Sequence, residues 1–269
     1  MIAKKKIAFL KILFVFYVFS VNITLIKCEE IGNSIDTLFQ SSIFIMIGTT
    51  YGANAGSFFK DYKTYLGGYY NDFKTEPSLT VGTKVVINEN FRLTASTSYI
   101  YSYLNESYNQ KFKSSKGDES RYINQRIDIK STPVFVSLEY FPYKEQFKSY
   151  IGGGVGLCYT GINWVEKVFS TYETDSRKGG IHLSENGLKP AFTIFAAIDL
   201  GFDKRPEETF IGSLLLETKF SYFFRKYRMF SKLAKQLKDN KGDFDNFYTI
   251  IPYYIGLNMG VTFNFVRKI

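Results

Sequence analysis

Odd-even alternation between apolar and polar residues limits the fold of this chain more than any other feature. From residue 251 to residue 265 every odd position holds an apolar residue, beginning with Ile251 and ending with Phe265. Most even positions between them hold small or polar residues, among them Asn258 and Gly260. Because successive side chains of a β-strand point to opposite faces, this stretch is expected to form a strand with one apolar face.

The same alternation recurs upstream and predicts seven further strands. They are expected at residues 42–51, 78–87, 91–101, 132–140, 150–159, 191–202 and 210–222. In the fourth of these, Pro133 and a change of parity after Ile127 and Ile129 predict a bulge or a sheet edge. With the C-terminal stretch, the sequence predicts eight strands.

The connections between these strands alternate between short and long. The short ones are 88–90, 142–146 and 203–208, and the long ones, each of about two dozen residues, are 53–77, 104–126, 161–187 and 224–248. This alternation is typical of outer-membrane barrels, which have short periplasmic turns and long outer loops. The predicted fold class is therefore all-β: an eight-stranded antiparallel up-and-down transmembrane β-barrel with four long outer loops. A soluble β-sandwich whose polar faces meet solvent is the alternative.

In a membrane barrel the apolar faces point to lipid and the polar faces point inward. The charged residues on the polar faces are Lys84, Arg92, Glu139, Asp199, Glu217 and Lys219. The first four lie within about five residues of a short turn, so we expect them near the periplasmic end of the interior, where two charges of each sign permit pairing. Eight strands enclose a lumen that side chains fill, so we expect a plugged or very narrow interior.

The N-terminus has the pattern of an export signal. Three lysines at Lys4–Lys6 precede the apolar run 12–21, which predicts a signal peptide over residues 1–28 and a barrel domain over residues 29–269. A retained membrane anchor is the alternative, although the run is shorter than the roughly 20 residues that a spanning helix needs. A lipidated Cys28 is disfavoured because a lysine precedes it.

Removal of the signal changes the charge and the cysteine count. Residues 1–28 contain five of the 34 basic residues and none of the 25 acidic ones, so the mature net charge falls from +9 to about +4. This balance gives little support to a nucleic-acid partner. Only Cys158 remains, so an intramolecular disulfide framework is excluded.

The end of the chain carries a recognisable pattern. Asn258, Gly260, Phe263 and Phe265 resemble the terminal sorting signal of bacterial outer-membrane barrels, which implies recognition by the barrel insertion machinery. Residues 76–102, "YIGGGVGLCY" at 150–159 and the closing "GVTFNF" resemble the major surface antigens of rickettsial bacteria of the Anaplasma, Ehrlichia and Wolbachia kind, or a generic small barrel of the OmpA or OmpW type. The resemblance implies a surface-exposed immunogenic barrel in the outer membrane, with adhesive or porin-like roles.

The last long connection is rich in basic residues. They include Arg225, Lys226, Arg228, Lys232, Lys235 and Lys238. Tyr227, Phe230, Ala234 and Leu237 recur at helical spacing, which predicts a short amphipathic helix. Two interpretations stay open: contact with an anionic surface such as lipopolysaccharide, a membrane or a host glycan, or a solvated helix that caps the barrel mouth.

Motifs for catalysis are weak. The lone histidine, His182, lies beside Ser184 and Glu185 in one predicted outer loop, and such a local cluster does not orient a base and a nucleophile from a scaffold. One histidine and one mature cysteine do not supply a structural transition-metal site. The glycines at 152–156 lie within a predicted strand, where they leave room for bulky neighbours. We therefore expect no enzyme, no metal and no cofactor.

The function that the sequence favours is a structural and adhesive role through the long outer loops, with a narrow porin-like channel for small solutes as the alternative. The expected partners are outer-membrane lipid, the insertion machinery and a host surface molecule or glycan. The oligomeric state stays open.

Overall fold

The computed structural model describes the strands and most of their connections. The described residues are 39–52, 58–59, 63, 67–88, 90–114, 117–142, 147–173, 175, 178–202, 210–225, 227–228, 249–250 and 253–267. Nearly all of them belong to one compact unit, Gln40–Phe265. In this part of the chain no helix is both long enough and apolar enough to cross a membrane.

The described residues form eleven strands. They are β1 (Phe39–Tyr51), β2 (Lys74–Thr75), β3 (Ser78–Val86), β4 (Phe91–Ser114), β5 (Gly117–Tyr140), β6 (Phe147–Ser170), β7 (Ile181–Gly201), β8 (Phe210–Phe223), β9 (Tyr227–Arg228), β10 (Thr249–Ile250) and β11 (Tyr253–Arg267).

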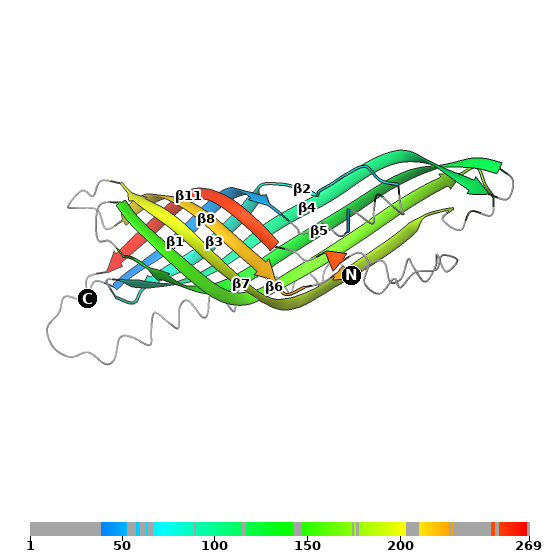
Figure 1. Cartoon of the computed structure of the whole chain (residues 1–269). Helices are drawn as coiled ribbons and strands as arrows, with labels where there is room; N and C mark the ends of the chain where they lie inside the picture. The colour runs from blue at the N-terminus through cyan, green and yellow to red at the C-terminus, as the bar shows by residue number, and fades with distance from the viewer. Residues whose placement is uncertain are drawn as a thin grey trace. The chain divides into compact units, whose positions relative to one another are not determined.

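Eight of these strands close into a ring. Around it the order is β4, β3, β1, β11, β8, β7, β6 and β5, and the pairing of β5 with β4 completes the circle. Neighbours along the chain are neighbours in the ring and run antiparallel, as an up-and-down barrel requires (Figure 1). The predicted eight-stranded antiparallel barrel is therefore confirmed, and the sandwich alternative is wrong.

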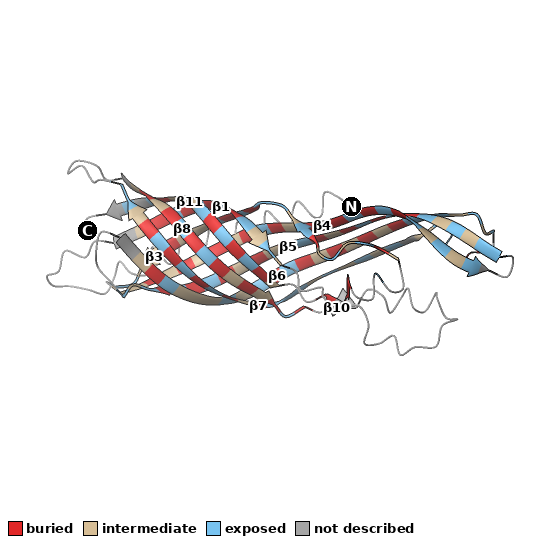
Figure 2. Cartoon of the chain, turned by 45° about the horizontal axis from the view of Figure 1, so that its top comes forward, coloured by how far each residue is buried: buried red, intermediate tan, exposed pale blue. Residues whose placement is uncertain are grey.

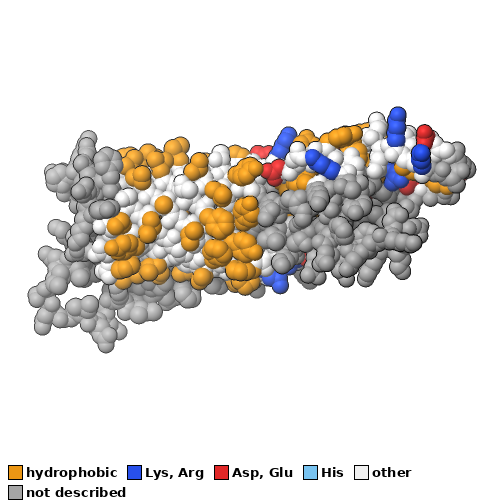
Figure 3. Space-filling model, viewed as in Figure 1, with side chains coloured by type: hydrophobic (Ala, Val, Ile, Leu, Met, Phe, Trp, Pro, Cys, Tyr) orange, Lys and Arg blue, Asp and Glu red, His pale blue; other side chains and the backbone are white. Residues whose placement is uncertain are grey.

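Burial alternates along every strand of the ring. In β1 the side chains of Ile43, Ile45 and Ile47 are exposed, whereas those of Phe44 and Met46 are buried (Figure 2). Exposed apolar side chains form what we call the apolar belt: Ile43, Ile45, Ile47, Leu79, Val81, Val136, Leu138, Ile151, Val155, Leu157, Ile194, Ile198, Leu216, Ile255, Leu257 and Met259. The belt covers the outside of the ring (Figure 3), as expected of strands that face lipid.

Exposed aromatic side chains lie at both margins of the belt. Tyr51, Tyr99 and Tyr159 lie at one margin, and Tyr140 and Phe265 lie at the other. Such girdles mark the two interfaces between membrane and water.

Four strands continue far beyond the ring. β4, β5 and β6 have 24 residues each and β7 has 21, whereas β1 has 13 and β8 has 14. Their continuation forms a four-stranded sheet that extends away from one end of the ring (Figure 1). We call residues 101–114, 117–130, 161–170 and 181–189 the protruding sheet.

The protruding sheet corrects the prediction that residues 104–126 and 161–187 are loops. β4 and β5 pair as far as Ser114 and Gly117, and β6 and β7 pair as far as Glu166 and Ile181. In these segments most apolar residues face inward and most polar residues face outward, with exceptions such as the buried Gln125 and the exposed Phe169. Apolar and polar residues thus alternate in these segments as well, but long runs of polar residues separate the apolar positions.

The predicted bulge or edge at Pro133 is also wrong. β5 lies between β4 and β6, and its register with β6 is the same on both sides of Pro133: Ile129 pairs with Ile162 and Val134 pairs with Leu157. The proline only interrupts the ladder with β4, where the Thr97 hydroxyl donates to the Pro133 carbonyl at 3.0 Å. The apolar residues of β5 therefore change from the inward face to the outward face near Pro133 because the surroundings of the strand change, while its backbone pairing stays the same.

Candidate functional site

Charged side chains meet inside the ring, near the end that carries the short turns. Lys84 Nζ lies 3.3 Å from Glu139 Oε1, and Arg92 Nη1 lies 3.7 Å from Asp199 Oδ2. Arg92 Nε also donates to Glu139, so that this carboxylate joins both cations. We call Lys84, Arg92, Glu139 and Asp199 the base cluster.

The base cluster is neutral overall and almost sealed from solvent. The side chains of Lys84 and Glu139 are 2% and 1% exposed. The Thr94 hydroxyl donates to Glu139 at 2.7 Å, and Lys84 Nζ donates to the Tyr150 hydroxyl at 2.6 Å. Because an isolated buried charge is costly, each member of this cluster depends on its partners.

Aromatic rings complete the surroundings of the two cations. Lys84 Nζ lies 5.0 Å from the Phe44 centroid and 4.7 Å from that of Tyr150, and the Arg92 guanidinium lies 4.6 Å from that of Phe141. These distances permit cation–π attraction.

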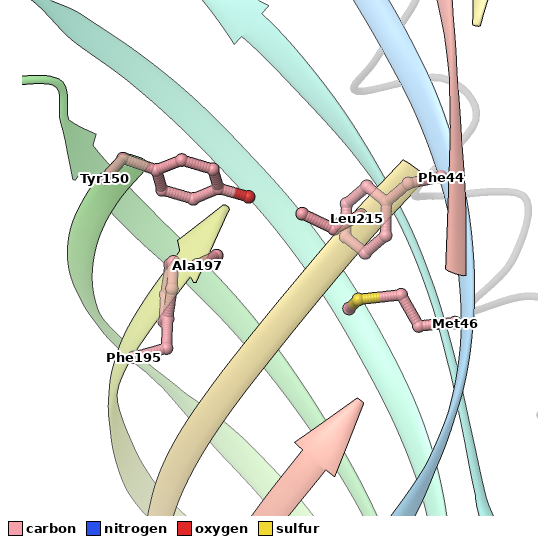
Figure 4. Close-up of a cluster of buried hydrophobic side chains, with 6 residues drawn as sticks. All are labelled: Phe44, Met46, Tyr150, Phe195, Ala197 and Leu215. Carbon is pink, nitrogen blue, oxygen red and sulfur yellow. The ribbon is translucent and has the colours of Figure 1, made fainter. Parts of the chain in front are cut away.

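An apolar cluster fills the lumen beside these charges. It consists of Phe44, Met46, Tyr150, Phe195, Ala197 and Leu215 (Figure 4). A Cβ at Gly152 would collide with the Phe195 ring, so the glycine leaves the space that the ring occupies. The prediction that these glycines admit bulky neighbours is confirmed at Gly152, whereas Gly154 and Gly156 approach the backbone of β5.

The middle of the lumen is nearly full. A cavity of about 20 Å³ lies between Thr80, Ser98, Lys219 and Tyr254. This volume is enough for about one water molecule. Beyond it lies a second apolar cluster, formed by Ile100, Phe135, Cys158, Ala191, Phe223 and Tyr254. In the part of the chain that the structure describes, the interior is therefore plugged.

The other two predicted interior charges lie outside the base cluster. Glu217 accepts a hydrogen bond from Asn258 Nδ2 at 2.9 Å, and Lys219 Nζ lies 5.4 Å from the Phe135 centroid. Both side chains are buried, at 8% and 9% exposed. Glu217 thus has a polar partner on the adjacent strand β11, and Lys219 of β8 has an aromatic partner on β5, three strands away in the ring.

The C-terminal residues with the sorting pattern divide between the two faces of β11. Asn258 points into the lumen, and a Cβ at Gly260 would collide with the Ile45 carbonyl, so this glycine permits the close approach of β11 to β1. Phe263 and Phe265 point outward and are 37% and 45% exposed. The pattern therefore combines ring closure with an aromatic outer margin.

Only part of the basic connection lies within the described residues. The Arg225 guanidinium is buried and pairs with Glu185 of the protruding sheet. Arg228 belongs to β9, which pairs with β10. Lys226, Lys232, Lys235 and Lys238 lie outside the described residues. Since Tyr227 also lies in β9, the predicted helix does not begin there.

Aromatic residues of the connection between β1 and β3 cover the inner face of the protruding sheet. Phe58 contacts Trp164 of β6 edge-on, with centroids 6.4 Å apart, and stacks on Phe73. The Tyr69 amide donates to Glu106 of β4 at 2.6 Å. The alternation pattern did not predict this contact, although the many aromatic residues of the connection between β1 and β3 were a usable signal.

The outer face of the protruding sheet carries a polar network next to the belt. Arg126 Nε lies 3.0 Å from both Asp128 oxygens, and Arg126 Nη2 donates to the Tyr101 hydroxyl at 2.9 Å. The hydrogen bond to Asp128 raises the pKa of the Arg126 guanidinium, with a further contribution from the bond to Tyr101. Lys130 Nζ lies 5.8 Å from the Tyr101 centroid.

The lone histidine has no catalytic surroundings among the described residues. His182 is exposed, and its Nε2 lies 2.9 Å from Asn163 Oδ1. Ser184 lies on the same outer face, whereas Glu185 pairs with the inward Arg225. These three side chains therefore do not converge.

The chain is a small outer-membrane β-barrel. This class of protein is defined by a closed ring of antiparallel strands and an apolar belt with aromatic margins, and here the ring has eight strands and a charged, filled lumen.

No family model matches the chain, and no curated protein matches its sequence. Solved structures are similar in fold. Neisserial surface protein A is 11% identical, with a TM-score of 0.42 over 86% of this chain and 97% of its own. The Yersinia pestis attachment invasion locus protein Ail, solved in complex with the heparin analogue sucrose octasulfate, is 12% identical, with a TM-score of 0.38 over 85% and 100%.

Proposed function

We propose that this protein is a surface-exposed structural and adhesive protein that makes contact through its protruding sheet and not through its lumen. The observation that carries the proposal is the length of the sheet beyond the belt. Residues 104–114 of β4 alone extend up to about 35 Å along the strand. A barrel that served only to fill the membrane would have no need of paired strands at this distance.

The orientation of the barrel supports this role. The strand ends that flank the short connections, such as Phe91 of β4 and Tyr140 of β5, pair with each other at the end opposite the protruding sheet (Figure 1). Short turns face the periplasm in outer-membrane barrels. The protruding sheet is then directed to the outside of the cell, where it meets host molecules.

The proposal includes the route to the membrane. Residues 1–28 act as a cleaved export signal, residues 29–269 form the mature barrel protein, and the insertion machinery recognises Asn258, Gly260, Phe263 and Phe265. It also includes kinship with the rickettsial surface antigens, on the short sequence words at 76–102 and 150–159. No enzymatic step, cofactor or nucleic acid is part of the proposal.

A shortened variant tests the adhesive role. Asn105 pairs with Arg126, and Val165 pairs with His182, so all four residues lie in one row of the sheet. Replacing residues 106–125 and 166–181 by Asn-Gly turns removes the sheet above this row and keeps the register. Bacteria that display the full chain should attach to host-cell monolayers, and those with the shortened chain should not.

Heat-modifiable mobility in detergent gels is the control, because the shortened barrel must still close. Equal attachment by a correctly closed shortened variant would contradict the proposal. So would a failure of the full chain to increase attachment over an empty vector.

The alternative, a narrow channel, predicts a different result in planar bilayers. The base cluster and the two apolar clusters fill the described lumen, so we expect no reproducible conductance steps. Stable unitary steps from the full chain would overturn this expectation and favour solute transport.

A further inference from the structure

The outer face of the protruding sheet is rich in side-chain amides. Asparagines recur on all four strands of this face: Asn105, Asn109, Asn124, Asn163 and Asn186. Asn124 Nδ2 donates to the Ser107 hydroxyl at 2.9 Å. Amides offer both donors and acceptors, so such a face can bind a ligand that carries many hydroxyl groups.

Two exposed aromatic rings lie side by side on the same face. Tyr122 of β5 pairs in register with Phe169 of β6, and their centroids are 6.3 Å apart. The side chains are 42% and 64% exposed. Tyr122 lies fourteen residues from Val136 of the apolar belt, which is roughly 45 Å along the strand. These rings therefore have no role as a membrane girdle.

Two cations lie next to this aromatic pair. Lys111 and Lys167 are exposed on the outer face, and neither forms an ion pair with a described acid. Lys167 precedes Phe169 by two residues and pairs with Asn124. Asp128 is engaged by Arg126. The face is thus cationic close to the rings.

These features select among classes of ligand. The headgroup layer of a bilayer is only about 5–8 Å deep, so lipid does not reach the rings from the belt. Two rings also present too little apolar area for the core of a stable protein interface. A sugar has an apolar face that stacks on aromatic rings and hydroxyl groups that pair with amides, and an acidic sugar adds the charge that lysines attract.

We propose that the outer face of the protruding sheet, centred on Tyr122 and Phe169, binds an acidic polysaccharide. The rings provide stacking, the asparagines bind hydroxyl groups, and Lys111 and Lys167 bind sulfate or carboxylate groups. This inference rests on the proposed surface-contact function and names the class of its ligand.

Binding of two polymers by the full chain, folded in detergent micelles, tests the proposal. Dextran sulfate should bind, and neutral dextran of the same length should bind at least about tenfold more weakly. Tyr122→Ser combined with Phe169→Ser should weaken dextran sulfate binding by about tenfold or more, as expected for loss of aromatic anchors. Lys111→Gln combined with Lys167→Gln should weaken it by a similar factor and should reduce its dependence on salt.

Two matched controls keep the test specific. Tyr69 is 70% exposed but belongs to the connection between β1 and β3, so Tyr69→Ser should leave binding unchanged. Lys189 is exposed and pairs in register with Cys158, whose side chain is buried on the inner face. Because paired residues share a face of the sheet, Lys189 lies on the face opposite to the rings, and Lys189→Gln should also have little effect. All variants must show the heat-modifiable mobility of a closed barrel.

Three outcomes would overturn the proposal. Unchanged binding by the double aromatic variant would mean that dextran sulfate is attracted by charge alone. Equal loss in the control variants would mean that the effect is not specific to this face of the sheet. Phosphatidylglycerol vesicles that compete fully with dextran sulfate would identify the face as a membrane contact.

If the aromatic variant loses neither polymer binding nor attachment to cells, the polysaccharide site fails while the adhesive function stands. If the full chain does not attach at all, the adhesive function itself fails.

Discussion

The protruding sheet continues four of the eight strands of the ring, yet the faces of the two regions are opposite in character. In β5, Val136 and Leu138 point outward in the ring, while Ser137 and Glu139 point into the lumen. In the protruding part of β5, Ile123, Ile127 and Ile129 point inward and are fully buried, while Asn124 and Arg126 point outward. The backbone continues without a change of register between the two parts.

The difference teaches that the solvent, and not the strand, decides which face is apolar. In hydrocarbon the outer face gains by being apolar, and the lumen holds the polar groups. In water the ordinary arrangement returns, with an apolar interior under a polar exterior. The level at which the pattern inverts, near residues 130–134 of β5, therefore marks the membrane surface.

The largest effect is expected from breaking the buried charges of the ring. Glu139→Gln removes the carboxylate that pairs with Lys84 and leaves Arg92 paired with Asp199 alone in the base cluster, and loss of one member of a buried ion pair costs about 3–5 kcal/mol. Urea unfolding of the barrel in lipid vesicles should show this loss of stability. Glu173→Gln, at an exposed turn, is the control and should leave the unfolding midpoint in place. A Glu139 variant as stable as the parent would mean that the cluster contributes nothing.

A smaller effect is expected from one substitution made at two heights of the same outer face. Val136→Arg places a charge in the apolar belt and should cost about 2–4 kcal/mol at the middle of the membrane. Asn124→Arg makes the same side chain in water and should change the stability by less than about 0.5 kcal/mol. The measurement is again urea unfolding in vesicles. Equal effects at the two positions would show that the belt does not face lipid.

The ring could be predicted from the sequence because hydrocarbon enforces a strict pattern. Each lipid-facing segment needs about ten residues of alternation, and each is long enough to be recognised. The protruding sheet was mistaken for loops because water imposes a weaker rule. Its inward apolar residues, such as Leu104, Tyr108 and Ile123, are widely spaced among polar residues, and the outer face carries mostly polar side chains.

The sequence did contain one signal of the protruding sheet. Ile127 and Ile129 have the parity of the lumen, and Val134 and Val136 have the parity of the belt. If the outer face is polar in water and apolar in lipid, this change of parity predicts one continuous strand that crosses the membrane surface, and no bulge is needed.

For the charged residues, their distance from the short turns placed them near one end of the lumen. Their partners could not be predicted, because contacts such as Lys84 with Tyr150 depend on the stagger of strands 66 residues apart.

The smallest effect is expected from the ion pair of the protruding sheet. Arg126 and Asp128 are as close as the partners in the base cluster, with a nitrogen-to-oxygen distance of 3.0 Å, but the Arg126 side chain is 56% exposed. Water screens such a pair, and many exposed pairs contribute nothing measurable to stability. Arg126→Gln should therefore leave the unfolding midpoint unchanged, and the contrast with Glu139→Gln isolates the role of the surroundings, since the two interactions share the same chemistry. A large loss of stability in the Arg126 variant would place the level of inversion above residue 126 and would move the membrane surface into the protruding sheet.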